Sequence, residues 1–122
     1  MTKSDLILRD AIKTVKCENF LVDVSLMPIL PYISDSEIVI GEMICKFKDI
    51  NCDHVFGGSL TLFGDSANDS KTKYYKIIKE HFPDILDKTK KLFDNKEYPK
   101  TSYQTKIYKR LANSSKKYGI KI

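Results

Sequence analysis

The chain has 122 residues, of which 42% are hydrophobic and 30% are charged, with 5 Gly and 4 Pro. This composition excludes a disordered or collagen-like chain, and the length favours a single domain spanning residues 1–122. No apolar run approaches the roughly 20 residues of a membrane-spanning helix, and no secretory signal is recognisable, so we expect a cytoplasmic protein without a membrane partner.

The net charge of +5 is distributed unevenly. Residues 1–70 hold 6 Lys and Arg against 11 Asp and Glu, a balance of −5, whereas residues 71–122 hold 15 against 5, a balance of +10. A basic segment is a candidate footprint for nucleic acid, but a solvated helix surface or an acidic protein partner explains it as well.

The three cysteines, Cys17, Cys45 and Cys52, are odd in number and far apart. They therefore argue against a disulfide framework, and their spacing matches no compact zinc or iron-sulfur motif. We expect small thiols that are buried or half-buried.

The first predicted elements are a helix and a strand. Apolar residues at helical spacing indicate an amphipathic surface helix over residues 5–16, with Ser4 as its N-cap. The nearly continuous apolar run of residues 20–30 is typical of a strand covered on both faces.

Polar residues and prolines interrupt this predicted strand. Asp23 and Ser25 are two residues apart and so share one side, which in a barrel is the lumen; alternatively, they bond to nearby backbone. Pro28 and Pro31 cannot continue a central ladder, so we expect the strand to end in their loop.

A second helix and a second strand follow. Ser34 and Glu37 have capping-box spacing before a helical apolar stripe, and residues 55–63 form an apolar run that contains Gly57 and Gly58. Strand, helix and strand in this order predict a parallel βαβ unit. Two strands alone leave sheet edges and an uncovered face, which favours an arc of a larger α/β barrel or a protomer that completes its sheet by association.

Residues 71–122 read as a basic helical extension. Their apolar residues trace helical stripes, with Pro83 at the start of one helix, a turn over residues 95–101, and Gly119 ending the last helix. The predicted organisation is therefore a barrel-like helix–strand–helix–strand part over residues 1–70 and a helical extension over residues 71–122.

Several segments of the chain resemble segments of one protein family and occur in the same order as in that family. Residues 23–35 (DVSLMPILPYISD) and 58–63 (GSLTLF) are similar to two late barrel strands of radical-SAM proteins related to spore photoproduct lyase. Four further pieces resemble the C-terminal helical extension of that family: residues 81–86 (HFPDIL), 91–93 (KLF), 98–99 (YP) and 118–120 (YGI). The resemblance thus spans nearly the whole chain and implies a partial (β/α) barrel.

The resemblance implies a [4Fe–4S] cluster held by a Cys-x3-Cys-x2-Cys loop, which cleaves S-adenosylmethionine to a radical. That loop is absent, since six residues separate Cys45 from Cys52. We therefore assign no catalytic residue and no metal ligand, and we expect no activity from this chain alone. By resemblance, Ser25, Pro28 and Pro31 lie on the cofactor side of the barrel, and a second polypeptide would carry the cluster.

Other catalytic motifs are weak. His54 and His81 have no nearby nucleophile and carboxylate in the sequence, so we expect structural or solvent-facing roles for both. Gly57 and Gly58 are not followed by the Lys-Ser or Lys-Thr pair of a phosphate-binding loop.

The alternative function is a small nucleic-acid-binding module. Its candidate contacts lie in the last helix and are Lys106, Lys109, Arg110, Lys116 and Lys117, interspersed with Tyr103 and Tyr108. Members of the resembled family act on DNA. The competing interpretation places Tyr103 in the core and the lysines on a solvated face. A homo-oligomer that closes its own sheet also remains open.

Overall fold

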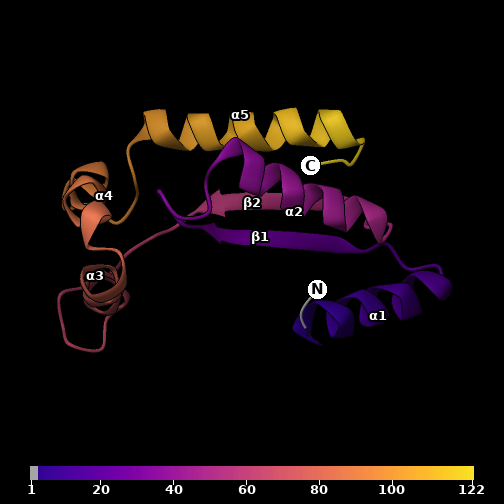
Figure 1. Ribbon diagram of the computed structural model, residues 1–122, viewed down its shortest axis with the longest axis horizontal. Helices are drawn as coiled ribbons and strands as arrows, with labels where there is room; N and C mark the ends of the chain where they lie inside the picture. The colour runs from indigo at the N-terminus through magenta and orange to yellow at the C-terminus, as the bar shows by residue number, and fades with distance from the viewer. Residues whose placement is uncertain (1–2) are drawn as a thin grey trace.

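The computed structural model describes residues 3–122, and over this range the chain is of the α/β class (Figure 1). A small parallel sheet is accompanied by five α-helices and one turn of 3-10 helix. In chain order the elements are α1 (Lys3–Cys17), β1 (Asp23–Ile29), α2 (Glu37–Asp49), β2 (His54–Ser59), α3 (Ser70–His81), η1 (Pro83–Ile85), α4 (Leu86–Phe93) and α5 (Thr101–Tyr118). The predicted α/β class and the parallel βαβ unit are confirmed.

The sheet pairs β1 with β2 in parallel, with Asp23 opposite His54 and Leu26 opposite Gly57. The C-terminal residues extend it slightly, because the Val55 amide donates a hydrogen bond to the Lys121 carbonyl over 2.8 Å. Lys121 therefore occupies part of the outer edge of β2. The outer edge of β1 is unpaired within residues 3–122.

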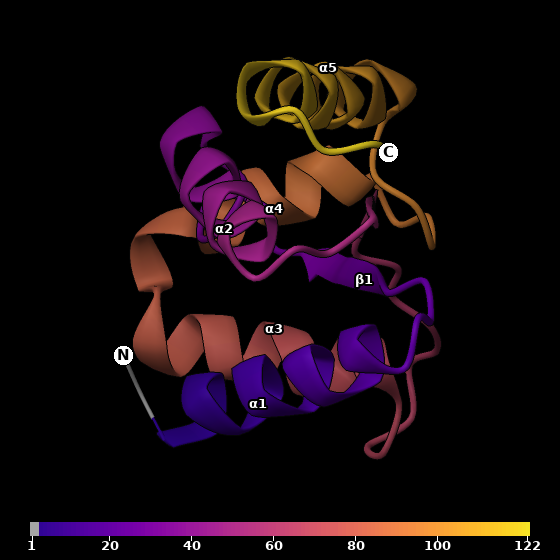
Figure 2. The ribbon, with the colours of Figure 1, turned by 90° about the vertical axis from the view of Figure 1, so that its right-hand side faces the viewer.

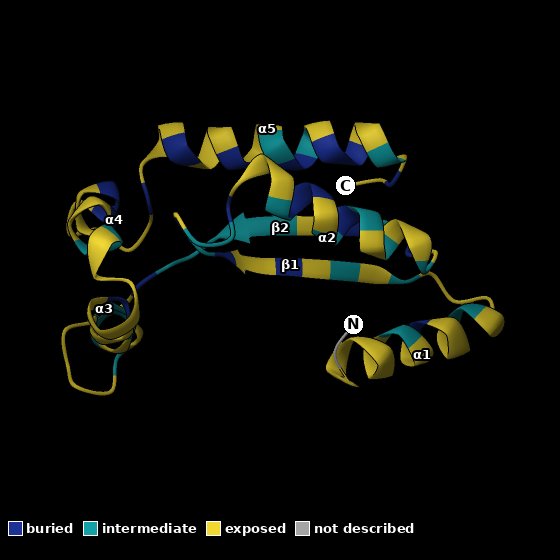
Figure 3. Ribbon diagram, in the orientation of Figure 1, coloured by how far each residue is buried: buried dark blue, intermediate teal, exposed yellow. Residues whose placement is uncertain are grey.

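One face of the sheet is covered by helices. Leu26 and Val55 project to this face, and both α2 and α5 pack there (Figure 2). The approach of α5 is close, since a Cβ built on Gly57 would lie 3.0 Å from Leu111 Cδ1. An apolar core lies around this face, and Figure 3 shows buried positions of α2 and α5 in dark blue. The core includes Leu26, Ile29, Ile40, Ile44, Val55, Leu62, Leu92, Phe93, Ile107, Leu111 and Ile120.

The opposite face of the sheet carries no helix in the described chain, and only connecting segments lie on that side of β1 in Figure 2. The prediction of a strand covered on both faces is therefore wrong for β1. Alternation explains which residues are left uncovered: as Val24 and Leu26 point toward the helices, Asp23 and Ser25 point away from them.

Two predicted helix caps differ from the structure. Ser36, not Ser34, is the N-cap of α2, and its Oγ accepts a hydrogen bond from the Val39 amide over 3.1 Å. Ser34 Oγ instead accepts from the Leu30 amide and closes the loop after β1, so it is not available to the helix. Ser4 lies inside α1 and not before it.

Both predicted strands are too long. Strand β2 ends at Ser59 because the chain then turns toward the helical part, where the Leu62 amide donates to the Glu97 carbonyl. Strand β1 passes through Pro28 and ends at Ile29. Pro28 is tolerated there because β1 is an edge strand and the register is irregular between Leu26 and Ile29.

The helical extension follows the predicted boundaries more closely. Pro83 opens η1, which leads into α4, and α3 and α4 pack against each other at the carboxyl end of the strands (Figure 1). Gly119 has a φ of 70°, a left-handed conformation that ends α5 as predicted. Among the described helices, none is both long and apolar enough to cross a membrane.

Helix α1 is a surface helix, as predicted, and it is the most loosely attached element. Ile12 is its buried residue, and Lys16 forms an ion pair with Asp53 at 2.9 Å. The remaining large apolar side chains of α1 are exposed. They are Leu6, Ile7, Leu8 and Val15.

Candidate functional site

The uncovered face of the sheet gathers polar and apolar side chains from both strands. We call it the open face, and define it by Asp23, Ser25 and Met27 of β1 with His54 and Phe56 of β2. The strand register places these residues side by side: Asp23 lies opposite His54, and Ser25 lies opposite Phe56.

The polar half of the open face is a hydrogen-bonded pair. His54 Nδ1 lies 2.9 Å from Asp23 Oδ1, and both side chains are partly exposed. A carboxylate in this position orients the imidazole ring and leaves Nε2 available to a ligand. Besides the expected structural or solvent-facing role, His54 is thus placed to position a ligand, which only the strand register could reveal.

The pair has no nucleophile in contact with it. Ser25 lies on the same face, but its hydroxyl makes no hydrogen bond to His54 among the described residues. Cys52 is near in sequence, but burial and the neighbouring Asp53 raise the pKa of its thiol and so favour the unreactive neutral form. The arrangement fits ligand positioning better than nucleophilic catalysis.

The apolar half of the open face consists of Met27 and Phe56, which are 55% and 50% exposed. The Met27 methyl group covers Gly58, where an added Cβ would lie 2.9 Å from it. Large apolar side chains left in water on a sheet face are characteristic of surfaces that another chain or a ligand covers.

The three residues predicted for a cofactor by resemblance do not form one site. Ser25 lies on the open face and Pro28 is exposed on the edge strand, whereas Pro31 is fully buried in the loop after β1. Only Ser25 and Pro28 are therefore accessible from the open side of the sheet, and their cofactor role stays a prediction.

The five predicted nucleic-acid contacts have different surroundings. Lys106, Lys109 and Lys116 are exposed along α5, and Tyr108 beside them is 65% exposed. Arg110 instead donates a hydrogen bond to the Asp35 carbonyl, which ties α5 to the loop after β1. Tyr103 is buried, as the competing interpretation expected.

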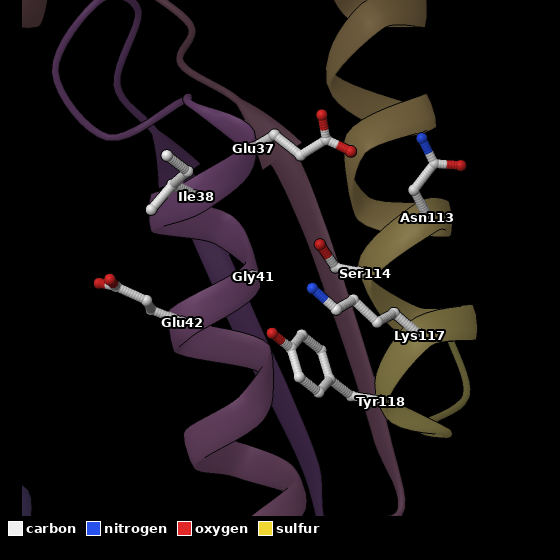
Figure 4. A pocket seen from close by; sticks show the side chains of 8 residues that line it. All are labelled: Glu37, Ile38, Gly41, Glu42, Asn113, Ser114, Lys117 and Tyr118. Atoms are coloured by element: carbon white, nitrogen blue, oxygen red, sulfur yellow. The ribbon is translucent and has the colours of Figure 1, made fainter.

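Lys117 adjoins a groove between α2 and α5 (Figure 4). Its amino group points into the groove and lies 5.3 Å from the centre of the Tyr118 ring. Glu37 points from α2 toward the same groove, while Ile38 and Glu42 point away from α5. The Glu37 carboxylate at this groove weakens the positive field around Lys117, which disfavours Lys117 as a phosphate contact.

A buried carboxylate at the carboxyl end of β1 was not predicted as a functional or structural feature. Asp35 accepts a hydrogen bond from the Tyr103 hydroxyl over 2.8 Å, and both residues are buried. Burial and this hydrogen bond raise the pKa of Tyr103, so the phenol stays a donor. No local pattern links residues so far apart in sequence, and the pair joins α5 to the βαβ unit.

The cysteines do not fit an iron-sulfur cluster. Cys17 is exposed, Cys45 is half-buried and Cys52 is buried, so the prediction of buried or half-buried thiols is wrong for Cys17. Within residues 3–122, no group of three or more Cys, His, Asp or Glu side chains is arranged to hold a metal ion.

Comparison of the chain with models of protein families, with curated proteins and with solved structures finds no match.

Proposed function

We propose that this chain is the C-terminal part, or a split subunit, of an α/β barrel of the radical-SAM, spore-photoproduct-lyase-like kind. The observation that supports the proposal most directly is the open face. In such a barrel, helices cover the outer face of the strands and the inner face lines the lumen. In this chain, α2 and α5 would lie on the outside, and Asp23, Ser25 and His54 would face the lumen.

The edges of the sheet indicate where a further strand can be added. Lys121 occupies part of the outer edge of β2, whereas the outer edge of β1 is unpaired in the described chain. A free edge with a partly apolar face beside it is a template for a strand of another chain. We infer that a partner polypeptide adds its strand beside β1 and that the rest of its barrel encloses the lumen onto which Phe56 projects.

The cluster and S-adenosylmethionine belong to the partner polypeptide in this proposal, because the cysteines of this chain do not fit a cluster. Asp23, Ser25 and His54 would face the common lumen, where they bind and orient a substrate. Alone, the chain would be inactive, and we place the assembly in the cytoplasm.

The test is site-specific photo-crosslinking in native cells under anaerobic conditions. We expect a chain with p-benzoylphenylalanine at position 56 to crosslink to a polypeptide that bears the three-cysteine loop and carries iron. The same probe at position 108, on the exposed side of α5, is the matched control and should not capture that polypeptide. Crosslinking only to a second copy of the chain, or no crosslinking at position 56, would contradict the proposal.

The exposed lysines of α5 favour a second candidate, a nucleic-acid-binding module. Lys106, Lys109 and Lys116 lie along one helix beside the exposed ring of Tyr108, a combination of cations and an aromatic that suits a single strand. In this case the charge reversals Lys106→Glu, Lys109→Glu and Lys116→Glu should each weaken oligonucleotide binding and reduce its salt dependence. Lys13→Glu on α1 is the control, and equal weakening by that variant would exclude a specific role for α5.

A further inference from the structure

A cavity lies at the amino ends of the strands and adjoins the open face at His54, and Lys106 and Lys109 of α5 do not line it. It has a volume of about 710 Å³ and is formed by the loops before β1 and β2 together with the C-terminal residues. Its volume is within the range of about 300–1,000 Å³ that small-molecule sites occupy. Basic side chains from separate parts of the chain line it: Lys16, Lys48, His54 and Lys121.

Two of the lysines have side chains that are held by contacts. Lys16 bonds both oxygens of Asp53 at 2.9 and 3.0 Å. Lys48 donates to the Gly119 carbonyl over 3.2 Å and keeps two further N–H donors. Lys121 is positioned through its own backbone carbonyl, which accepts from the Val55 amide. The side chains of Lys16 and Lys48 are thus fixed at the cavity, whereas Lys121 is placed there by its backbone.

The fourth group, His54, is oriented by Asp23. Because its Nδ1 donates to Asp23 Oδ1 over 2.9 Å, the Nε2 of a neutral ring is an acceptor, and only the imidazolium form would offer an N–H to an anion in the cavity.

The charge of the cavity is positive. Lys16, Lys48 and Lys121 face a single lining carboxylate, Asp53, which gives a balance of +2 with His54 neutral. Asp53 is already engaged, since it also accepts a hydrogen bond from the Val22 amide over 2.7 Å. The Val22 amide and Lys16 hold the pKa of that carboxyl below its usual range, so Asp53 stays an anion paired with Lys16. Within residues 3–122, Lys48 and Lys121 therefore have no carboxylate partner.

We propose that this cavity binds a small phosphate-bearing anion, of the size of a nucleotide, through Lys48 and Lys121. Compact ammonium groups are suited to phosphate oxygens, and two or three of them around one space suit a polyphosphate better than a single phosphate. Leu21 lies at the same cavity and is exposed, so it offers an apolar contact to the organic part of the ligand. Nothing in this inference depends on the proposed barrel.

The test is calorimetric titration of the full chain with inorganic tripolyphosphate at low salt. We expect Lys121→Met and Lys48→Met each to weaken binding about tenfold, which corresponds to about 1.4 kcal/mol. Lys121→Met is the cleaner variant, because the backbone bridge that positions residue 121 does not use the side chain. Lys106→Met and Lys109→Met are the matched controls and should leave the affinity unchanged.

Titrations with ATP and with a single-stranded oligonucleotide distinguish a nucleotide ligand from a nucleic-acid ligand. ATP should bind at least as tightly as tripolyphosphate and should respond to the same two variants. A single-stranded oligonucleotide that responds to Lys48→Met and Lys121→Met while tripolyphosphate and ATP do not bind would overturn the proposal. So would an affinity that the control variants lower as much as the cavity variants, since that result indicates only a nonspecific response to net charge.

Discussion

The two faces of the β1–β2 sheet have opposite environments although they are made by alternating residues of the same two strands. On the covered face, Leu26 and Val55 are buried under α2 and α5. On the open face, Phe56 is half-exposed beside the Asp23–His54 pair. The difference teaches that the helices of this chain complete only one side of the sheet, and that large side chains on the other side contribute little to the stability of the chain by itself.

Truncation of one residue on each face should give the largest contrast. Leu26→Ala should lower the free energy of unfolding by about 2–5 kcal/mol, because it removes buried methyl groups and leaves a cavity. Phe56→Ala removes a larger side chain but should cost less than about 1 kcal/mol, because its ring is already in water. Urea denaturation of both variants measures the two changes.

The order of these two costs is the discriminating result. If Phe56→Ala costs as much as Leu26→Ala in the purified chain, the open face is covered in solution. A loss of stability that depends on protein concentration would then identify the cover as a second copy of the chain.

Loss of the hydrogen bond between Tyr103 of α5 and Asp35 should give the next largest decrease in the free energy of unfolding. Tyr103→Phe leaves the buried Asp35 without its hydroxyl donor and should cost about 1.5–3 kcal/mol. Tyr74→Phe is the matched control: its hydroxyl is buried but has no hydrogen-bond partner in the described structure, so its loss should be neutral or slightly stabilising. If the two variants lower the free energy of unfolding equally, the hydrogen bond between Tyr103 and Asp35 does not stabilise the packing of α5 on the βαβ unit.

The same two tyrosines predict a decline of stability at alkaline pH. Burial raises the pKa of Tyr74 to about 12, and burial with the Asp35 hydrogen bond also raises the pKa of Tyr103. A raised folded-state pKa contributes stability that is fully present below the unfolded value of about 10 and is lost as the pH rises above it. We expect the free energy of unfolding to fall between pH values of about 10 and 12. Tyr103→Phe should make this decline shallower.

The elements that the sequence predicted correctly depend on local periodicity. Apolar spacing located the helices, and the two apolar runs located both strands and their parallel pairing. The alternation of side chains placed Asp23 and Ser25 on one side, and Gly119 marked the end of α5. Each of these features is decided by residues within a few positions of one another.

The features that could not be predicted depend on contacts between distant residues. Strand β2 ends early because the backbone at Leu62 bonds to Glu97, and the outer edge of β2 is met by Lys121. The Asp23–His54 pair required the strand register, and the Asp35–Tyr103 bond required the packing of α5. A chain with no repeated motif offers no local signal for any of these pairings.

The smallest expected contrast uses the two adjacent glycines of β2, which project to opposite faces. A Cβ at Gly57 would lie 3.0 Å from Leu111 Cδ1 and 3.2 Å from the backbone oxygen of Leu26, so Gly57→Ala forces the covered face apart. We expect a net loss of about 1–2 kcal/mol, since overpacking of about 1–3 kcal/mol outweighs the smaller backbone gain of alanine.

At Gly58 the added Cβ would meet the Met27 methyl, the far end of a flexible and exposed side chain that can move into solvent. Gly58→Ala should therefore be neutral or stabilise the chain by up to about 0.5–1 kcal/mol. Thermal denaturation of the two variants side by side measures the sign of each change. If Gly58→Ala is the more harmful of the two in the isolated chain, Met27 cannot move away, and the open face must be closed by something that the fold of a single chain does not supply.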